Sequence, residues 1–183
     1  MSLSPSDAPS PSPSPAHPRF AQALADLGLT VPVRSFPEGT RTAADAAAAI
    51  GCELAQIVKS LIFTAWGSPL SDQGRELGGG VPVLVLMDGA SRVDVQRVRA
   101  ELQATKVTRA DAALVRETTG YAIGGVPPFG HRVRTRVLAD RGLLAHDEVW
   151  AAAGTPHTVF PLAPTTLIEH AQGRVVDVRE RSS

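Results

Sequence analysis

Gly120-Tyr-Ala-Ile-Gly-Gly-Val-Pro-Pro-Phe-Gly-His131 carries the strongest backbone signature in the chain, and we call it the glycine–proline loop. It holds four glycines and two adjacent prolines. Proline fixes φ and removes an N–H donor, whereas glycine tolerates positive φ and lets another molecule approach the backbone closely. The stretch is therefore expected to present shaped main chain. Taken alone, it fits a proline-stiffened turn between two strands slightly better than a ligand-binding loop.

Short strands and short helices are expected on both sides of this loop. Apolar and β-branched runs predict strands at 31–36, 57–65, 81–87, 133–138, 149–153, 158–162 and 174–178, and helical spacing predicts helices at 19–27, 42–50, 93–102, 110–118 and 166–171. Few strands are separated by a helix long enough for a parallel crossover. The sequence predicts an α/β fold of the α+β type, with a mixed, largely antiparallel sheet or partly closed barrel surrounded by helices.

Several helix ends carry recognisable signals. Thr42 is expected to cap the second helix with Asp45 completing a capping box, and Thr165 is expected to cap the last helix. The polar, glycine-rich segment 68–80 is expected to be a hairpin-like loop or small insertion.

Length and composition indicate one folded domain. Of the 183 residues, the first eighteen include six serines and six prolines and lack the features of a signal peptide, so 1–18 is expected to be a disordered tail and 19–183 a single domain. The one cysteine, Cys52, excludes a disulfide framework. No apolar run approaches the roughly 18 residues of a membrane span. A cytoplasmic setting is expected.

Formal charge is zero, which argues against binding nucleic acid by bulk electrostatics but leaves a local basic patch open. Sixteen of the 18 basic residues are arginines. Among them Arg132, Arg134 and Arg136 alternate along one expected strand face, which either guides phosphates or is simply solvated. Lys59 is one of only two lysines and begins an apolar strand, where an unpaired buried ammonium is costly. Its side chain either extends to the surface or enters a polar pocket that suits an anionic ligand.

Several of these features together resemble the YbaK family of aminoacyl-tRNA deacylases, which is related to the editing domain of bacterial prolyl-tRNA synthetases. They are the helix opened by Thr42, the strand segment Val58-Lys-Ser-Leu61, the apolar strand ending at Asp88-Gly89, and the Gly-x-x-x-Pro pattern of Gly124 to Pro128. The resemblance runs from about Phe20 to Val178. It implies a mixed barrel surrounded by helices, with no metal and no organic cofactor.

The resemblance also implies a function, which is hydrolysis of the ester in a mischarged aminoacyl-tRNA by an oriented water. The expected partners are the CCA acceptor end and, as a second candidate, an aminoacyl-tRNA synthetase, for a chain that is a monomer or weak dimer without membrane association. Lys59, Gly124 and Gly125 are the expected catalytic residues. The expected substrate-binding residues are Thr42, Ser60, Val126, Pro127, Pro128, Phe129, Gly130, His131, Asp140 and His157.

Other functions and roles stay open at this stage. A non-catalytic module could use the same pocket to bind an aminoacyl or nucleotide-like ligand, or the acceptor end of a tRNA. A metal-assisted hydrolase would use His131, Asp140 and His157, whose spacing matches no zinc motif. For the two histidines a structural hydrogen bond is an equal alternative. Phe36, Trp66 and Phe129 are candidate stacking faces, although core packing suits each of them better. The edited amino acid is not specified by the sequence.

Overall fold

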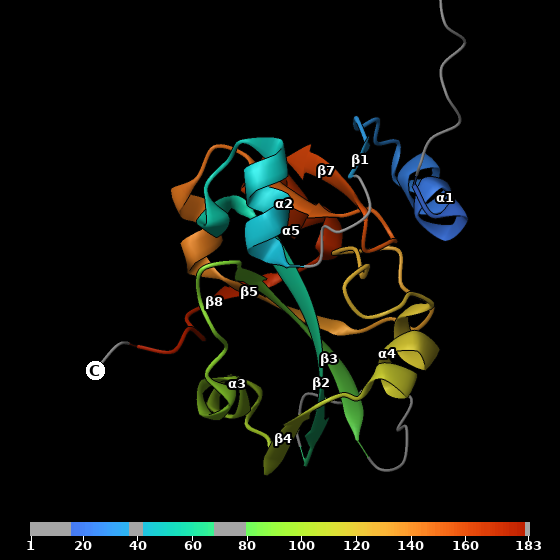
Figure 1. Ribbon diagram of the computed structural model, residues 1–183. Coiled ribbons are helices and arrows are strands. Elements are labelled where there is room, and N and C mark those ends of the chain that lie inside the picture. The colour runs from blue at the N-terminus through green and yellow to red at the C-terminus, as the bar shows by residue number, and fades with distance from the viewer. Residues whose placement is uncertain (1–15, 37–41, 68–79, 182–183) are drawn as a thin grey trace, which may run out of the picture.

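The computed structural model describes residues 16–36, 42–67 and 80–181 (Figure 1). Its helices are α1 (Pro18–Leu27), α2 (Ala43–Ile50), α3 (Val95–Leu102), α4 (Ala112–Thr119) and α5 (Pro164–Ala171), with 3-10 turns η1 (Leu54–Gln56) and η2 (Arg141–Ala145). Its strands are β1 (Arg34–Ser35), β2 (Val58–Trp66), β3 (Val81–Asp88), β4 (Lys106–Arg109), β5 (Arg136–Asp140), β6 (Val149–Ala152), β7 (Thr158–Leu162) and β8 (Arg174–Val176).

These strands form two sheets, a larger one of order β4-β2-β3-β5-β8 and a smaller one of order β1-β7-β6. In the larger sheet β2 pairs antiparallel with β3 and β4, whereas β5 pairs parallel with β3 and β8. The smaller sheet is antiparallel. The mixed, largely antiparallel architecture is thus confirmed, and the described strands do not close into a barrel.

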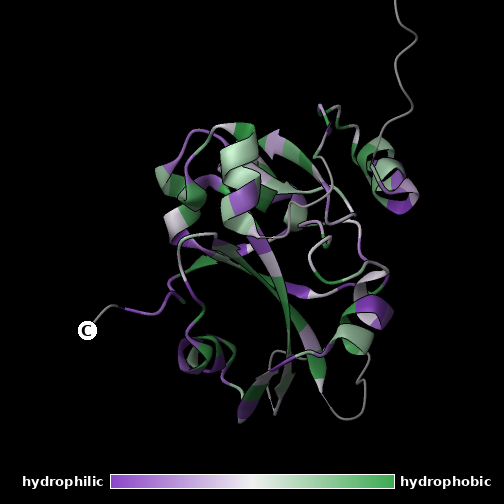
Figure 2. Ribbon diagram, in the orientation of Figure 1, coloured by the Kyte–Doolittle hydropathy of each residue, from purple (hydrophilic) through white to green (hydrophobic). Residues whose placement is uncertain are grey.

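The larger sheet is buried on both faces. Leu84 and Leu86 of β3 point into a core with α1, α4, α5 and the smaller sheet, whereas Val83, Val85 and Met87 point into a second core with α3 and β4. This arrangement explains why β3 reads as an uninterrupted apolar run. Figure 2 shows the same contrast between the hydrophobic central strands and helices that also carry hydrophilic residues.

The helix-start prediction at Thr42 is confirmed. The Thr42 hydroxyl accepts a hydrogen bond from Asp45 N (3.0 Å), and the Asp45 carboxylate accepts one from Thr42 N (3.2 Å). The prediction for the last helix was wrong in its detail, because α5 begins at Pro164 with Ala163 at the cap position. Proline is well suited to the first helical position, where its missing N–H costs nothing.

Other differences concern element boundaries. The sequence pattern does not predict a strand at β4, and β1 is shorter than the predicted strand 31–36. β5 starts three residues late, because the chain before it is tied to α4 by bonds from Arg132 N to Thr119 O and from Val133 N to Thr118 O. Residues 1–15 of the predicted tail and residues 68–79 of the predicted insertion lie outside the described residues. His17 belongs to the folded part, since its N–H donates to Ala153 O (3.1 Å).

Across the three described ranges, no helix is both long enough and apolar enough to cross a membrane.

Candidate functional site

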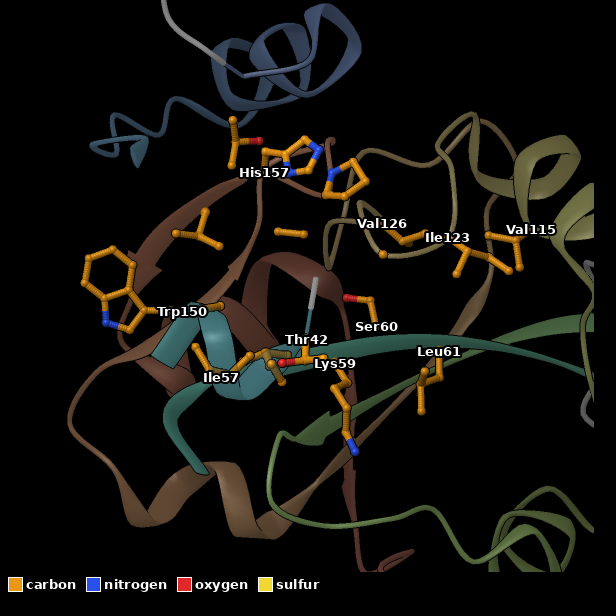
Figure 3. Close-up of a pocket in the computed structure, with 18 of the residues that line it drawn as sticks. Thr42, Ile57, Lys59, Ser60, Leu61, Val115, Ile123, Val126, Trp150 and His157 are labelled. Atoms are coloured by element: carbon orange, nitrogen blue, oxygen red, sulfur yellow. The ribbon is translucent and has the colours of Figure 1, made fainter. Parts of the chain in front are cut away.

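A pocket of about 510 Å³ lies between the two sheets, α2, α4 and the glycine–proline loop (Figure 3). Residues 58–62 of β2 line its centre. The loop contributes Ile123, Gly124 and Val126, and the segment 156–159 lies beside them. The remaining lining residues are Phe36, Thr42, Ala43, Ala46, Ile57, Arg109, Ala110, Val115, Trp150 and Ala152. Most of these side chains are apolar, so the few polar groups are the ones that can orient a ligand.

The first half of β2 has an open edge along this pocket. β4 pairs with β2 only from Phe63 onward, and the smaller sheet reaches β2 through an isolated bridge between Ile57 and Trp150. Just beyond β4, Ala110 N donates to the Ile62 carbonyl oxygen (3.0 Å), and between Ile57 and Ile62 no strand of the described chain pairs with this side of β2. An unpaired strand edge presents N–H and C=O groups to a ligand.

The side chains of β2 alternate across this edge. Val58 and Ile62 belong to the core that also contains Val126 of the loop, whereas Leu61 packs against the other core. Figure 3 shows Ser60 on the side of β2 where Val126 lies, and Lys59 pointing to the opposite side with Leu61. The structure therefore places Lys59 and Ser60 in one pocket but on different faces of the strand.

Lys59 is half-buried, and its ammonium donates a hydrogen bond to the Ser91 carbonyl oxygen. Burial lowers the pKa of Lys59, Asp88 raises it, and the positive charges of Arg109 and Arg92 lower it further. The net direction is downward. The ammonium thus lies on the α3 side of the sheet, on the face of β2 opposite to Val126 of the loop.

Ser60 carries a buried hydroxyl without a hydrogen-bond partner among the described residues. Nearly all buried polar side-chain atoms in folded proteins have a partner, and leaving one unpaired costs about 1–3 kcal/mol. Because the hydroxyl faces the loop side of the pocket, it is suited to pairing with a polar ligand atom there.

The glycine–proline loop is a tight turn held against the segment before β7. Gly124 has φ +87°, and Gly125 N donates to the Ala122 carbonyl oxygen (3.0 Å). A Cβ added at Gly125 would lie 2.8 Å from Cα and C of Thr155, so only glycine fits this approach. The Gly125 N–H is thus used inside the turn, and among the described residues the N–H groups of Gly124 and Val126 form no backbone hydrogen bond.

The side chains of Tyr121 and His131 each donate a hydrogen bond to a backbone carbonyl of the glycine–proline loop. The Tyr121 hydroxyl donates to the Gly130 carbonyl oxygen (3.0 Å), and Nε2 of His131 donates to the Pro127 carbonyl oxygen (2.6 Å). Burial raises the pKa of Tyr121 to about 12, so the hydroxyl keeps its proton at neutral pH. Burial lowers the pKa of His131, which the bond to Pro127 opposes only partly. His131 therefore acts on the shape of the loop.

The structure places the other predicted site residues in two groups. Thr42 and His157 line the pocket. Pro127, Pro128 and Phe129 are buried, and the Phe129 ring stacks on Phe20 (5.7 Å between ring centroids) in the core. Gly130 lies against Ala23 and Tyr121.

Asp140 has a structural environment. It is fully buried, and its carboxylate accepts bonds from Gly142 N (2.9 Å) and Val178 N (3.0 Å). The described part of the chain contains no group of three histidine, cysteine, aspartate or glutamate residues that could hold a metal ion. His131, Asp140 and His157 are therefore not brought together.

Some pocket residues carry no functional signal in the sequence. Arg109 was missed with the strand that carries it, and the exposed rim residue Ile123 (53% exposed) had no signal beyond its place in the loop. Trp150 lies below the Arg34 guanidinium (5.6 Å to the ring centroid), which orients the ring at one end of the pocket.

Comparisons with known proteins agree with this architecture. YwhH of Bacillus subtilis (strain 168), a protein described as uncharacterised, is 29% identical over 147 residues, which are 80% of this chain and 85% of YwhH. The proline–tRNA ligase of Limosilactobacillus fermentum (strain NBRC 3956 / LMG 18251) is 31% identical over 105 residues, covering 57% of this chain and only 17% of the ligase.

Solved structures extend the likeness. A crystal structure of a protein proposed to be a trans-editing enzyme for prolyl-tRNA synthetase superposes with a TM-score of 0.80 at 37% identity, covering 93% of this chain and all of that one. The hypothetical protein APE2540 superposes with a TM-score of 0.75 at 28% identity, covering 88% of this chain and 99% of its own. The family model of the aminoacyl-tRNA editing domain matches residues 37–169, and the chain belongs to this family.

Proposed function

We propose that this chain is a stand-alone deacylase that hydrolyses the ester bond of mischarged aminoacyl-tRNA. The observation that carries the proposal is the pocket, in which the open edge of β2 faces the glycine–proline loop across a space lined mostly by apolar side chains. Membership of the editing-domain family and the likeness to a protein proposed to edit in trans support the same reaction. A small amino acid suits these surroundings, and a tRNA served by prolyl-tRNA synthetase is the first substrate to test.

In this proposal the loop side of the pocket receives the aminoacyl group. The backbones of Gly124 and Val126 bind it, and the Ser60 hydroxyl, which has no partner among the described residues, supplies a polar contact. Gly125 contributes through the turn that its N–H closes. Lys59 binds the terminal nucleotide from the other face of β2.

Hydrolysis then needs only an oriented water. The water oxygen adds to the ester carbonyl carbon, the bond to the ribose oxygen breaks, and that oxygen takes a proton, which releases free amino acid and tRNA. An aminoacyl ester is already activated, so no protein nucleophile is required. Backbone N–H donors that stabilise the oxyanion contribute about 3–4 kcal/mol each in comparable sites.

A panel of mischarged tRNAs tests the proposal. The wild-type chain is expected to release amino acid from at least one member, and Lys59→Ala is expected to do so more slowly with a higher KM. The matched control is Lys106→Ala, which removes the other lysine, whose ammonium lies over the Trp66 ring (5.1 Å) away from the pocket residues. Absence of turnover on every tRNA refutes the deacylase, and binding without turnover identifies a binding module.

A further inference from the structure

A second, cationic face of β2 begins at the open edge that borders the pocket. Lys59, Leu61 and Phe63 alternate onto this face, and Arg109 of β4 lies directly opposite Phe63 in the register. Directly opposite residues of an antiparallel pair point to the same face of the sheet. Lys59, Leu61 and Arg109 are among the residues that line the pocket, so the pocket reaches the edge of β2 where this face begins.

Arg92 joins this face through the turn after β3. The Lys59 ammonium is bonded to the carbonyl of Ser91, the residue immediately before Arg92. Both Arg92 and Arg109 are exposed, and both act electrostatically on Lys59, as does the carboxylate of Asp88. We call Lys59, Arg92 and Arg109 the cationic cluster.

Other arginines of this region form salt bridges. Arg97 pairs with Asp177 (3.0 Å), Arg174 with Glu101 (2.8 Å), and Arg179 lies near Asp140 (3.9 Å). Arg141 and Arg181 also pair with Asp177 (3.3 and 3.5 Å). Within the described ranges, Arg92 and Arg109 form no salt bridge. Their positive charges repel that of Lys59 and lower its pKa. Like charges gathered beside a pocket favour binding of a polyanion, because the ligand removes their mutual repulsion.

We propose that the cationic cluster binds the phosphodiester backbone of a single-stranded RNA 3′ end, which crosses the open edge of β2 to reach the loop. This inference rests on the proposed function and assigns the two faces of β2 different parts of the substrate. The aminoacyl group lies on the Ser60 face, and the phosphates lie on the Lys59 face. Arginine suits phosphate because its planar guanidinium donates two parallel hydrogen bonds.

Salt dependence of binding to a deacylated acceptor-stem minihelix ending in CCA tests the inference without requiring turnover. Each lost phosphate contact to a single strand reduces the magnitude of the negative slope of log K against log salt concentration by about 0.7. The Arg92→Gln/Arg109→Gln variant is therefore expected to reduce it by about 1.4. Between 50 and 200 mM salt the wild type then loses about sevenfold more affinity than the double variant.

The control is Arg99→Gln/Arg134→Gln, which removes equal charge from exposed arginines whose side chains donate hydrogen bonds to Gln96 and Gln172. It is expected to keep the wild-type slope. Equal slopes for the two double variants overturn the inference, because the effect is then bulk charge. An Arg92→Gln/Arg109→Gln variant that keeps the wild-type slope overturns it as well. Deacylation is measured in parallel. If the wild type is active and the Arg92→Gln/Arg109→Gln variant has unchanged deacylation activity, this inference alone is refuted. If the wild type is inactive, the deacylase proposal is refuted and the comparison of salt slopes stays valid.

Discussion

Gly125→Ala is expected to change the shape of the loop, and its effect on activity can be compared with its effect on the stability of the fold. The added Cβ would lie 2.8 Å from Cα and C of Thr155 and 3.1 Å from the Gly154 carbonyl oxygen, whereas ordinary contacts begin at 3.4 Å. All of these atoms are backbone, so the loop or the facing segment must move by about 0.6 Å. Overpacking of this kind costs about 1–3 kcal/mol of unfolding free energy.

The same displacement acts on the pocket, because Gly124 and Val126 line it on either side of Gly125. A shift of about 1 Å in a positioning group costs on the order of 100-fold in rate, so we expect kcat/KM for deacylation to fall between about 10-fold and 100-fold.

Gly28→Ala is the matched control for this change. Gly28 ends α1 with φ +67°, and an added Cβ meets no atom within 4 Å, so the variant has only the left-handed strain of about 1–2 kcal/mol. Urea unfolding gives the stability of both variants, and release of amino acid from mischarged tRNA gives the rate. The reasoning is refuted if Gly125→Ala keeps wild-type kcat/KM, or if Gly28→Ala loses as much activity at equal stability.

Three further results are expected. Ser60→Ala removes a hydroxyl that has no partner among the described residues, so urea unfolding should show unchanged stability or a gain of about 1 kcal/mol, whereas kcat/KM should fall; a clear loss of stability would reveal a structural bond. Burial lowers the pKa of His131 in the folded protein from its ordinary value of 6.5, so below pH 6.5 the unfolded chain binds more protons than the folded one. The contribution of His131 to stability is therefore complete above pH 6.5 and is lost as the pH falls toward the folded pKa. Urea midpoints between pH 5 and 8 should show this decline in the wild type and a weaker one in His131→Gln, and equal slopes would contradict it. Asp140→Asn should cost about 2–3 kcal/mol, because the Gly142 and Val178 N–H groups lose a charged acceptor, and it should leave kcat/KM of the folded protein unchanged; an activity loss beyond the unfolded fraction would return Asp140 to the site.

The sequence was most informative where local chemistry and burial agree. The capping box at Thr42 and the apolar run of β3 could both be read directly, because a cap and a two-sided core impose residue types at fixed positions. β4 could not, since its four residues 106–109 include three polar ones and its strand conformation depends on pairing with β2. Strand formation is strongly dependent on tertiary context.

The sequence predicted several residues of the candidate pocket but not the faces of β2 on which they lie. The sequence indicated that Lys59 and the glycine–proline loop belong together, and the structure places both beside one pocket. The sequence could not show that the Lys59 ammonium and the Ser60 hydroxyl lie on opposite faces of β2, because that depends on which face of the strand meets the loop. His131 and Asp140 show the same limit, since their bonds to Pro127 and to Gly142 and Val178 depend on the folded loop and chain end.

A crystal structure of the chain with a short RNA ending in CCA, carrying a non-hydrolysable amide-linked 3′ aminoacyl group, tests the central claim most directly. We expect the aminoacyl group between Ser60 and the backbone of Gly124 and Val126, with phosphates beside Arg92 and Arg109 on the other face of β2. An aminoacyl group bound on the Lys59 face, or outside the pocket, would contradict it.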